Sequence, residues 1–298
     1  MNKLSRLTED LSRRRFLAGA GAAVTAMAAV GCGDNNNSSS TPTTPPTTSP
    51  TITDADILNF ALNLEYLEAE FYLRAATGSG LTSADAGSSA GSVTGGSMVA
   101  FKTPAIQQYA NEIANHELAH VRFLRKALGS AAVNRPAIDL TASFNAAASA
   151  AGIGSSFNPF ADENSFLLGA FIFEDVGVTA YHGAASLLSD KTNLAAAGAI
   201  LATEAYHAGT IRTLIAQLGD PYLTTANKIS TLRATAGGGA ETMLDASHIV
   251  AADSNSIAYS RTTDQVLHIV YLSAAAGVVS KGGFYPSGLN GTITATKS

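Results

Sequence analysis

The sequence predicts an all-α fold: a four-helix bundle with one long crossover connection and a C-terminal extension of short helices and turns. Three observations predict it. Apolar side chains recur at helical spacing in four long segments. A Glu followed seven residues later by a Tyr occurs in the first and third segments, and a Glu-x-x-His pair occurs in the second and fourth. Because offsets of three and seven return to one face of a helix, each segment presents its polar pair on a single face.

The first helix is expected over residues 54–76, after Thr53 as N-cap and with acidic residues in its first turn. Glu65 and Tyr72 share one face of it, and the adjacent face is also apolar. A helix that is apolar around most of its circumference is typical of the interior of a bundle. The Gly/Ser-rich segment that follows, residues 78–97, is expected to be a mobile loop without chemistry.

The second helix is expected over residues 104–128, because Pro104 suits a first turn and Gly129 ends a helix. Glu117 and His120 lie in its apolar stripe. Burying a carboxylate and an imidazole there costs free energy unless a partner compensates.

The second half repeats this plan. Residues 134–160, with a short helix at 141–151, form the connection that must run the length of the bundle. Helices are expected at 162–189 and 192–218. The third helix carries Glu174 and Tyr181, and the fourth carries Glu204 and His207.

The pattern predicts that six side chains converge in the bundle interior: Glu65, Glu117, His120, Glu174, Glu204 and His207. Four carboxylates repel one another unless cations or protons neutralise them. Two divalent metal ions would balance the charge, and a mixed carboxylate and imidazole set suits iron or manganese. One Glu from each of two helices and a Glu-x-x-His from each of the other two is a di-metal arrangement.

The roles within this set follow from the repeat. We expect Glu65 and Glu174 to be terminal ligands, Glu117 and Glu204 to bridge the two metals, and one histidine to bind each metal. Tyr72 and Tyr181 are expected to hydrogen-bond ligands. The alternative is that these residues are surface acids and core histidines, as a single Glu-x-x-His would be.

Other polar residues are open to more than one interpretation. Glu68 shares the face of Glu65 and competes with it as the ligand from the first helix. Glu70 is expected in solvent. His116 is expected to be solvated or to support a ligand, and His182 turns off the site face.

Residues 220–298 form the expected C-terminal extension, with short helices at 225–236 and 263–275 and glycine-rich turns beyond them. His248 and His268 lie there without a partnered carboxylate in the pattern and are expected to be structural. Residues 53–219 and this extension therefore account for the folded part of the chain.

The N-terminus predicts export. Residues 12–17, SRRRFL, fit the twin-arginine pattern, and a short apolar run follows, so residues 1–32 are interpreted as a signal segment. Cys32, the only cysteine, ends the sequence AVGC, which resembles a lipoprotein cleavage box. We expect a lipid on Cys32 and a periplasmic or cell-surface location, with ordinary cleavage as the alternative. Residues 33–52, rich in Asn, Ser, Thr and Pro, are expected to be a disordered tether.

The formal charge of −5 offers no basic patch, so nucleic acid is not expected as a partner. The chain is 46% hydrophobic and 14% charged, which suffices for a sizeable core. The expected partners are a small-molecule oxidant and, through Cys32, a membrane. The sequence leaves the oligomeric state open.

The motifs resemble a known family. NLEYLEAEFYL is similar to the first helix of ferritin-like proteins, and the order of the four motifs resembles ferritins, bacterioferritins, rubrerythrins and manganese catalases. QVLHIVY and GGFYPSGLNG extend the resemblance to exported ferritin-like proteins akin to plant desiccation-related proteins, over residues 54–291. The resemblance implies the bundle and the di-metal centre at the six residues above. The long loop and the extension depart from compact ferritins, which speaks against a closed storage shell.

Two classes of function follow. One is a di-metal oxidoreductase that acts on peroxide or oxygen, either catalase-like or ferroxidase-like. The other is a non-catalytic envelope or desiccation-stress protein that uses the bundle structurally. Oxygen release from peroxide separates the two.

Overall fold

The structure is a computed structural model that describes residues 51–273 and 277–297. The predicted signal segment, Cys32 and nearly all of the tether lie outside the described residues. Within them, no helix combines the length and the apolarity needed to cross a bilayer.

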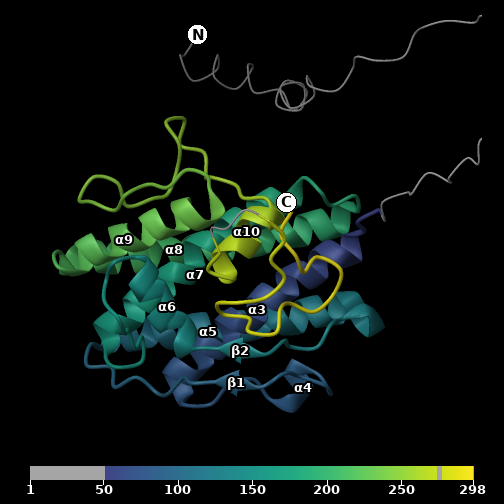
Figure 1. Cartoon of the computed structure of the whole chain (residues 1–298), viewed down its shortest axis with the longest axis horizontal. Helices are drawn as coiled ribbons and strands as arrows, with labels where there is room; N and C mark the ends of the chain where they lie inside the picture. The colour runs from purple at the N-terminus through teal and green to yellow at the C-terminus, as the bar shows by residue number, and fades with distance from the viewer. Residues whose placement is uncertain (1–50, 274–276, 298) are drawn as a thin grey trace, which may run out of the picture. The chain divides into compact units, whose positions relative to one another are not determined.

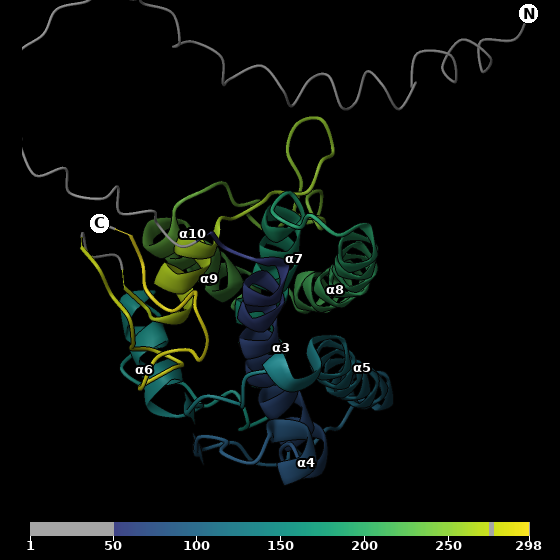
Figure 2. The ribbon, with the colours of Figure 1, turned by 90° about the vertical axis from the view of Figure 1, so that its right-hand side faces the viewer.

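Four long helices form the bundle (Figure 1): α3 (Asp54–Thr77), α5 (Pro104–Leu128), α7 (Glu163–Ala185) and α8 (Lys191–Leu218). α3 packs against α5, α7 packs against α8, and α3 and α7 meet in the middle. Seen end-on, α5 and α8 lie on one side of α3 and α7, while α6, α9, α10 and the C-terminal segment lie on the other (Figure 2). The predicted all-α fold, a four-helix bundle with a long connection between its halves, is confirmed.

Local chemistry sets the helix ends. Thr53 and Asp56 form a reciprocal capping box at the start of α3, and Gly78, at a φ of 78°, ends it in the left-handed conformation. α7 ends at Ala185, before the expected residue 189. The backbone amides of Ser189 and Asp190 donate to the Asp54 carboxylate at 2.9 and 3.0 Å, which turns the chain back toward α3 before α8 begins.

Residues 78–97 contain structure that the sequence did not predict. They include α4 (Ser83–Ala86) and β1 (Val93–Thr94), which pairs in parallel with β2 (Ile138–Asp139). The loop also covers Glu70: the backbone amide of Leu81 donates to its carboxylate at 3.2 Å, and a Cβ at Gly80 would lie 1.9 Å from Oε2. A side chain at Gly80 would displace the Glu70 carboxylate.

The expectation that Glu70 lies in solvent is wrong, because its side chain is fully buried. The Arg74 guanidinium donates to its Oε2 at 2.8 Å, and Arg135 pairs with Oε1. Arg135 follows α5 and is far from Glu70 in sequence. Two arginines and a covering loop therefore stabilise a carboxylate that faces away from the predicted metal ligands.

The connection between the halves contains β2 and α6 (Ala142–Ala150). Phe144 of α6 lies at the centre of an aromatic cluster, with ring centroids 5.8 Å from Phe71, 5.7 Å from Phe173 and 5.2 Å from Phe284. These rings come from the crossover, from both central helices and from the C-terminal segment. Burial of the cluster therefore fixes the extension against the bundle.

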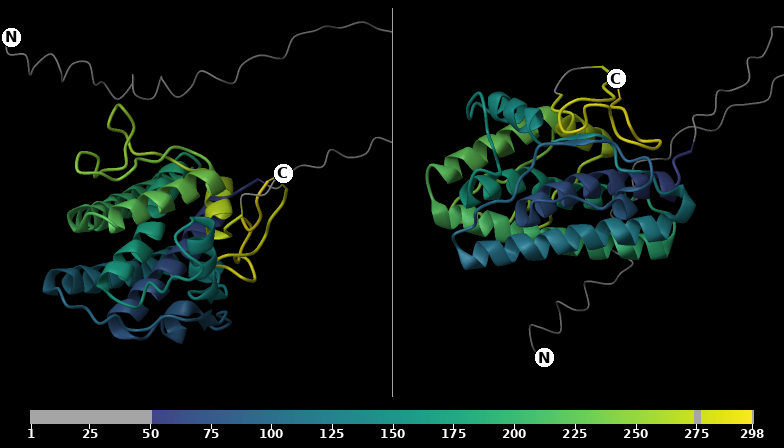
Figure 3. Two further views of the ribbon diagram at one scale, coloured as in Figure 1. Left: turned by 60° about the vertical axis from the view of Figure 1, so that its left-hand side comes forward. Right: turned by 90° about the horizontal axis from the view of Figure 1, so that it is seen from below.

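The extension contains α9 (Tyr222–Gly237) and α10 (Thr263–Val270). α10 ends earlier than the expected residue 275, and residues 274–276 lie outside the described part. The C-terminal segment runs beside the bundle (Figure 3). There the Tyr285 hydroxyl donates to the Asn63 carbonyl at 2.8 Å, and the Asn290 amide donates to the Asn63 side chain at 3.0 Å. GGFYPSGLNG therefore anchors the extension to α3.

Candidate metal centre

The structure brings all six predicted ligand residues together inside the bundle. Each side chain offers one ligand atom, and these atoms lie within 4.8 Å of one another in two groups. The first group is Glu65, Glu117, His120 and Glu204, and the second is Glu117, Glu174 and His207. The two groups share Glu117, and each takes residues from both halves of the chain.

The first group surrounds the imidazole of His120. Its Nδ1 lies 3.2 Å from Oε2 of Glu65, 3.4 Å from Oε2 of Glu117 and 3.4 Å from Oε1 of Glu204. The carboxylates are fully buried, whereas His120 keeps 12% of its side chain exposed. This group comes from α3, α5 and α8.

The second group surrounds His207, whose Nδ1 lies 3.1 Å from Oε1 of Glu117 and 3.5 Å from Oε2 of Glu174. Glu117 thus turns one oxygen toward each histidine, which is the arrangement expected of a bridging carboxylate. Glu204 falls in the first group only. Its bridging role stays a prediction.

The two tyrosines hold glutamates of the opposite half. The Tyr72 hydroxyl, on α3, donates to Oε1 of Glu174 on α7. The Tyr181 hydroxyl, on α7, donates to Oε1 of Glu65 on α3. The heptad spacing predicted that tyrosines would support the ligands, and the structure adds that the support crosses between the halves.

The polar atoms that face one another in the centre are placed to bind a cation, because they form few hydrogen bonds among themselves. Both oxygens of Glu117 and Glu204, Oε2 of Glu174 and Nδ1 of His207 are buried and make no well-aligned hydrogen bond with any described residue. Buried polar atoms without partners cost free energy. Two cations would satisfy them, and the nitrogen and oxygen donor set suits iron or manganese. The residues present therefore fit a di-metal centre.

Burial also shifts the protonation of the metal-free site. It raises the pKa of Glu65 to about 7 against the attraction of His120, and it raises the pKa of Glu174 and, much more, that of Glu204. For Glu117, burial is outweighed by the close approach of the His120 and His207 imidazoles, which favour the ionised carboxylate, and its pKa falls below the ordinary value. For His207, burial is outweighed by Glu174 and Glu117, which raise its pKa to about 11.

Glu68 is 5% exposed and lies on the site face, but it belongs to neither ligand group. Glu65 therefore fits the role of helix-one ligand better. Burial and the neighbouring Glu204 raise the pKa of Glu68 well above its ordinary value. A Cβ at Gly177 would lie 2.4 Å from Oε2 of Glu204 and 3.4 Å from Oε1 of Glu68. Gly177 thus leaves room for two carboxylates, a role that its place in an apolar run did not reveal.

His116 supports His207 from outside. Its Nδ1 lies 2.9 Å from Nε2 of His207, and the two rings stack with centroids 5.2 Å apart. This contact holds the outer nitrogen of His207 while the inner one faces the carboxylates. His182 instead approaches the carbonyl oxygen of Tyr259, at 3.0 Å and away from the centre.

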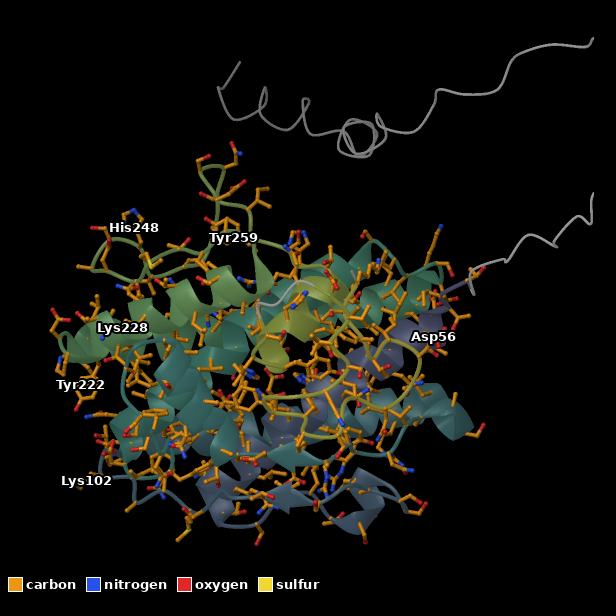
Figure 4. All side chains as sticks on the ribbon, viewed as in Figure 1. Asp56, Lys102, Tyr222, Lys228, His248 and Tyr259 are labelled. Carbon is orange, nitrogen blue, oxygen red and sulfur yellow. The ribbon has the colours of Figure 1, made fainter. Side chains whose placement is uncertain are left out.

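The remaining histidines take no part in the centre. His248 pairs with Asp245 at 2.9 Å on an outer loop (Figure 4). His268 lies 2.7 Å from the carbonyl oxygen of Ser273.

A surface cleft of about 270 Å³ between α5 and α8 reaches His207. Its walls include Tyr109, Glu112, His116, Tyr206 and Thr210. Tyr206 is 78% exposed at the rim, whereas His207 is 5% exposed. The cleft brings solvent to the outer edge of the candidate centre.

For the metal-free protein we predict that stability falls as pH rises from about 4.5 toward neutrality. The pKa of Glu65 rises from 4.5 to about 7 on folding, so between these values the folded protein keeps a proton that the unfolded chain has released. This shift alone corresponds to roughly 3 kcal/mol. The raised pKa of His207 continues the decline above 6.5. The lowered pKa of Glu117 makes stability rise with pH, but only below pH 4.5, the ordinary pKa of a glutamate.

Bound metal should reverse the slope. The ligands must then be deprotonated, so protons compete with metal and stability falls as pH falls. Melting temperatures measured between about pH 5 and about pH 7, with and without chelator, should change in opposite directions. Parallel slopes would show that the carboxylates are solvated and would rule out a buried centre.

Comparison with known proteins agrees with this geometry. The ferritin-like domain family matches residues 53–217, which span α3 to α8. The chain is 31% identical over 270 residues to the ferritin-like catalase Nec2 of Nesocodon mauritianus, covering 80% of this chain and 84% of that protein. It is 30% identical over 266 residues to the desiccation-related protein PCC13-62 of Craterostigma plantagineum, covering 80% and 83%. The chain therefore belongs to the ferritin-like family.

Proposed function

We propose that this protein is a di-iron or di-manganese redox protein that acts on peroxide or oxygen, with peroxide disproportionation as its principal reaction. The observation that carries the proposal is the set of buried, unpartnered ligand atoms arranged around the shared Glu117. The similarity to a protein named as a ferritin-like catalase supports the choice of peroxide. Two bound metal ions would supply open coordination positions and the redox change.

The protein's own residues have separate tasks in this proposal. Glu65 and Glu174 bind as terminal ligands, and the hydroxyls of Tyr181 and Tyr72 hold their outer oxygens. Glu117 turns one oxygen toward each histidine and would be a ligand shared by both metals. His120 and His207 complete the two ligand sets, and Glu204 adds a further carboxylate beside His120.

The cleft between α5 and α8 is the route of approach in this proposal. It ends at His207, and the side chains of Glu112, His116 and Thr210 in its walls can hydrogen-bond a small oxidant. His116 stacks on His207 at the inner end of the cleft and keeps the imidazole from turning toward solvent.

The second candidate function is that of a non-catalytic envelope or desiccation-stress protein. The match to a desiccation-related protein has nearly the same identity as the match to the catalase. The C-terminal segment also bonds directly to α3 through Asn63, which favours a rigid bundle. Metal would then stabilise the fold without turnover.

We also infer export by the twin-arginine route and lipid attachment at Cys32. The SRRRFL and AVGC sequences support this inference. A folded, metal-loaded bundle is a suitable cargo for that route. The protein would then act in the periplasm or at the cell surface.

The first prediction from this proposal concerns metal stoichiometry. The exported protein should hold two iron or manganese ions per chain, measured by elemental analysis after gel filtration. Glu117→Gln should lower occupancy at both positions together, because both groups use this carboxylate. Loss of only one ion would contradict the bridging assignment.

Glu70→Gln is the matched control for metal loss. Glu70 is as buried as Glu117 but pairs with arginines, so this variant should keep both metals while losing about 3 kcal/mol of stability. Equal metal loss in the two variants would contradict the assignment of the site.

The second prediction concerns turnover. Fully loaded protein should release oxygen from hydrogen peroxide faster than the same concentration of free metal, as measured with an oxygen electrode. Thr210→Trp, which fills the cleft beside His207, should lower kcat/KM at unchanged metal content. Thr213→Trp, on the exposed side of the same helix, should not. Full occupancy without oxygen release would favour the non-catalytic alternative.

The third prediction concerns location. Arg13→Lys combined with Arg14→Lys should leave the precursor in the cytoplasm, as followed by cell fractionation. Cys32→Ala should move the exported protein from the detergent phase to the aqueous phase. Normal export of the double variant would exclude the twin-arginine route, and a wild-type protein already in the aqueous phase would exclude the lipid.

A further inference from the structure

A second buried cluster of charged side chains lies beside the metal centre and takes no part in it. It consists of Asp175 on α7, Arg212 on α8, Arg233 on α9, and Glu241 and Arg261 in the connection between α9 and α10. Each of these side chains is at most 4% exposed. Three guanidinium groups face two carboxylates, so the cluster carries one excess positive charge.

The ion pairs form a chain. Asp175 accepts from Arg212 at 2.8 Å and from Arg233 at 2.6 Å. Glu241 accepts from Arg233 at 2.8 Å and from Arg261 at 2.6 Å. Every carboxylate is therefore shared between two arginines, and none remains to neutralise the third cation. An uncompensated charge in the interior is costly.

Of the three arginines, Arg261 has the fewest compensating contacts, so we assign the excess positive charge to it. Arg212 also donates to the carbonyl oxygens of Ile249 and Thr242. The Arg233 guanidinium lies 4.6 Å from the centre of the Phe171 ring. Arg261 has only Glu241 and the Thr179 hydroxyl, and its Nε has no hydrogen-bond partner among the described residues. Burial and the nearby Arg233 lower its pKa, consistent with an under-neutralised cation.

A cavity of about 90 Å³ adjoins this cation. Its polar lining comes from Arg212, Arg261, Thr179 and Tyr259 and from Asp175 and Glu241, whose carboxylates are already paired with the arginines. The other walls are mainly small apolar residues such as Ala208. Tyr259 lies where the long loop after α9 meets the helices (Figure 4). A water molecule needs roughly 10–15 Å³ of such volume, so this cavity has room for a small solute.

We propose that this cavity binds a small, singly charged anion, a halide or a short-chain carboxylate, next to Arg261. One negative charge would complete the neutralisation of the cluster. Guanidinium groups are strong donors to such ions. The apolar walls favour ions with weak hydration or a short alkyl tail over sulfate. Bound there, the anion would link α7 and α8, which carry three of the metal ligands, to the connection that leads to α10.

The site is independent of the proposed metal chemistry, so its test needs no turnover. Melting temperatures of the full chain, both metal-loaded and chelated, are measured while acetate or bromide replaces gluconate at constant ionic strength. Each small anion should raise the melting temperature by about 2–4 °C with a saturating concentration dependence. No rise with either anion, or a rise that stays linear, would overturn the proposal.

Two glycines of α8 provide a matched pair of variants. A Cβ at Gly209, which lines the cavity, or at Gly198, which does not, would have no atom within 4 Å. Gly209→Leu should fill the cavity and abolish the saturable rise, and Gly198→Leu should keep it. If the melting temperatures of the two variants responded equally to the anions, the anion would bind outside this cavity and the proposal would be wrong.

Direct observation completes the test without any variant. A wild-type crystal soaked in bromide should show an anomalous peak beside Arg261, displaced when acetate is added. A cavity that holds only water under both conditions would overturn the proposal.

Discussion

The structure depends on the burial of four ligand carboxylates and two imidazoles at one level of a helical bundle. Each carboxylate repels its neighbours, and burial penalises every ionised form, so protons or cations must balance the cluster. The features around it serve this requirement. The hydroxyls of Tyr72 and Tyr181 each donate to one carboxylate oxygen, and the missing side chain of Gly177 leaves room for two carboxylates. His116 contacts the outer nitrogen of His207.

Helical periodicity explains how much of this centre could be predicted from the sequence. Offsets of three and seven place Glu117 with His120, and Glu65 with Tyr72, on one face without knowledge of any other helix. Both halves carry the same pattern, so the sequence also indicates that the four helix faces with these pairs meet in the bundle interior. The family resemblance then supplied the arrangement of the four helices, and the ranges of α3 and α5 were predicted to within about one residue.

What the sequence could not supply are contacts that depend on the relative height and rotation of separate elements. Glu70 was expected in solvent because its helical face gives no sign of Arg135, which reaches it from the crossover. The stacking of His116 on His207 depends on how α5 and α8 are aligned along the bundle. The arginine cluster around Asp175 likewise draws on segments whose isolated charges look like ordinary surface residues. A local pattern carries no information about such long-range pairings.

The crossed tyrosine bonds have a consequence for how such a protein can be divided or assembled. Tyr72 belongs to the first half of the chain but completes the environment of Glu174, and Tyr181 does the same for Glu65. Each ligand group also combines helices from both halves. A fragment cut in the connection between the halves would therefore retain an incomplete ligand set for either ion. Two identical half-bundles that docked face to face would form both crossed bonds at once, so these two bonds are those expected of a two-fold pair joined into one polypeptide.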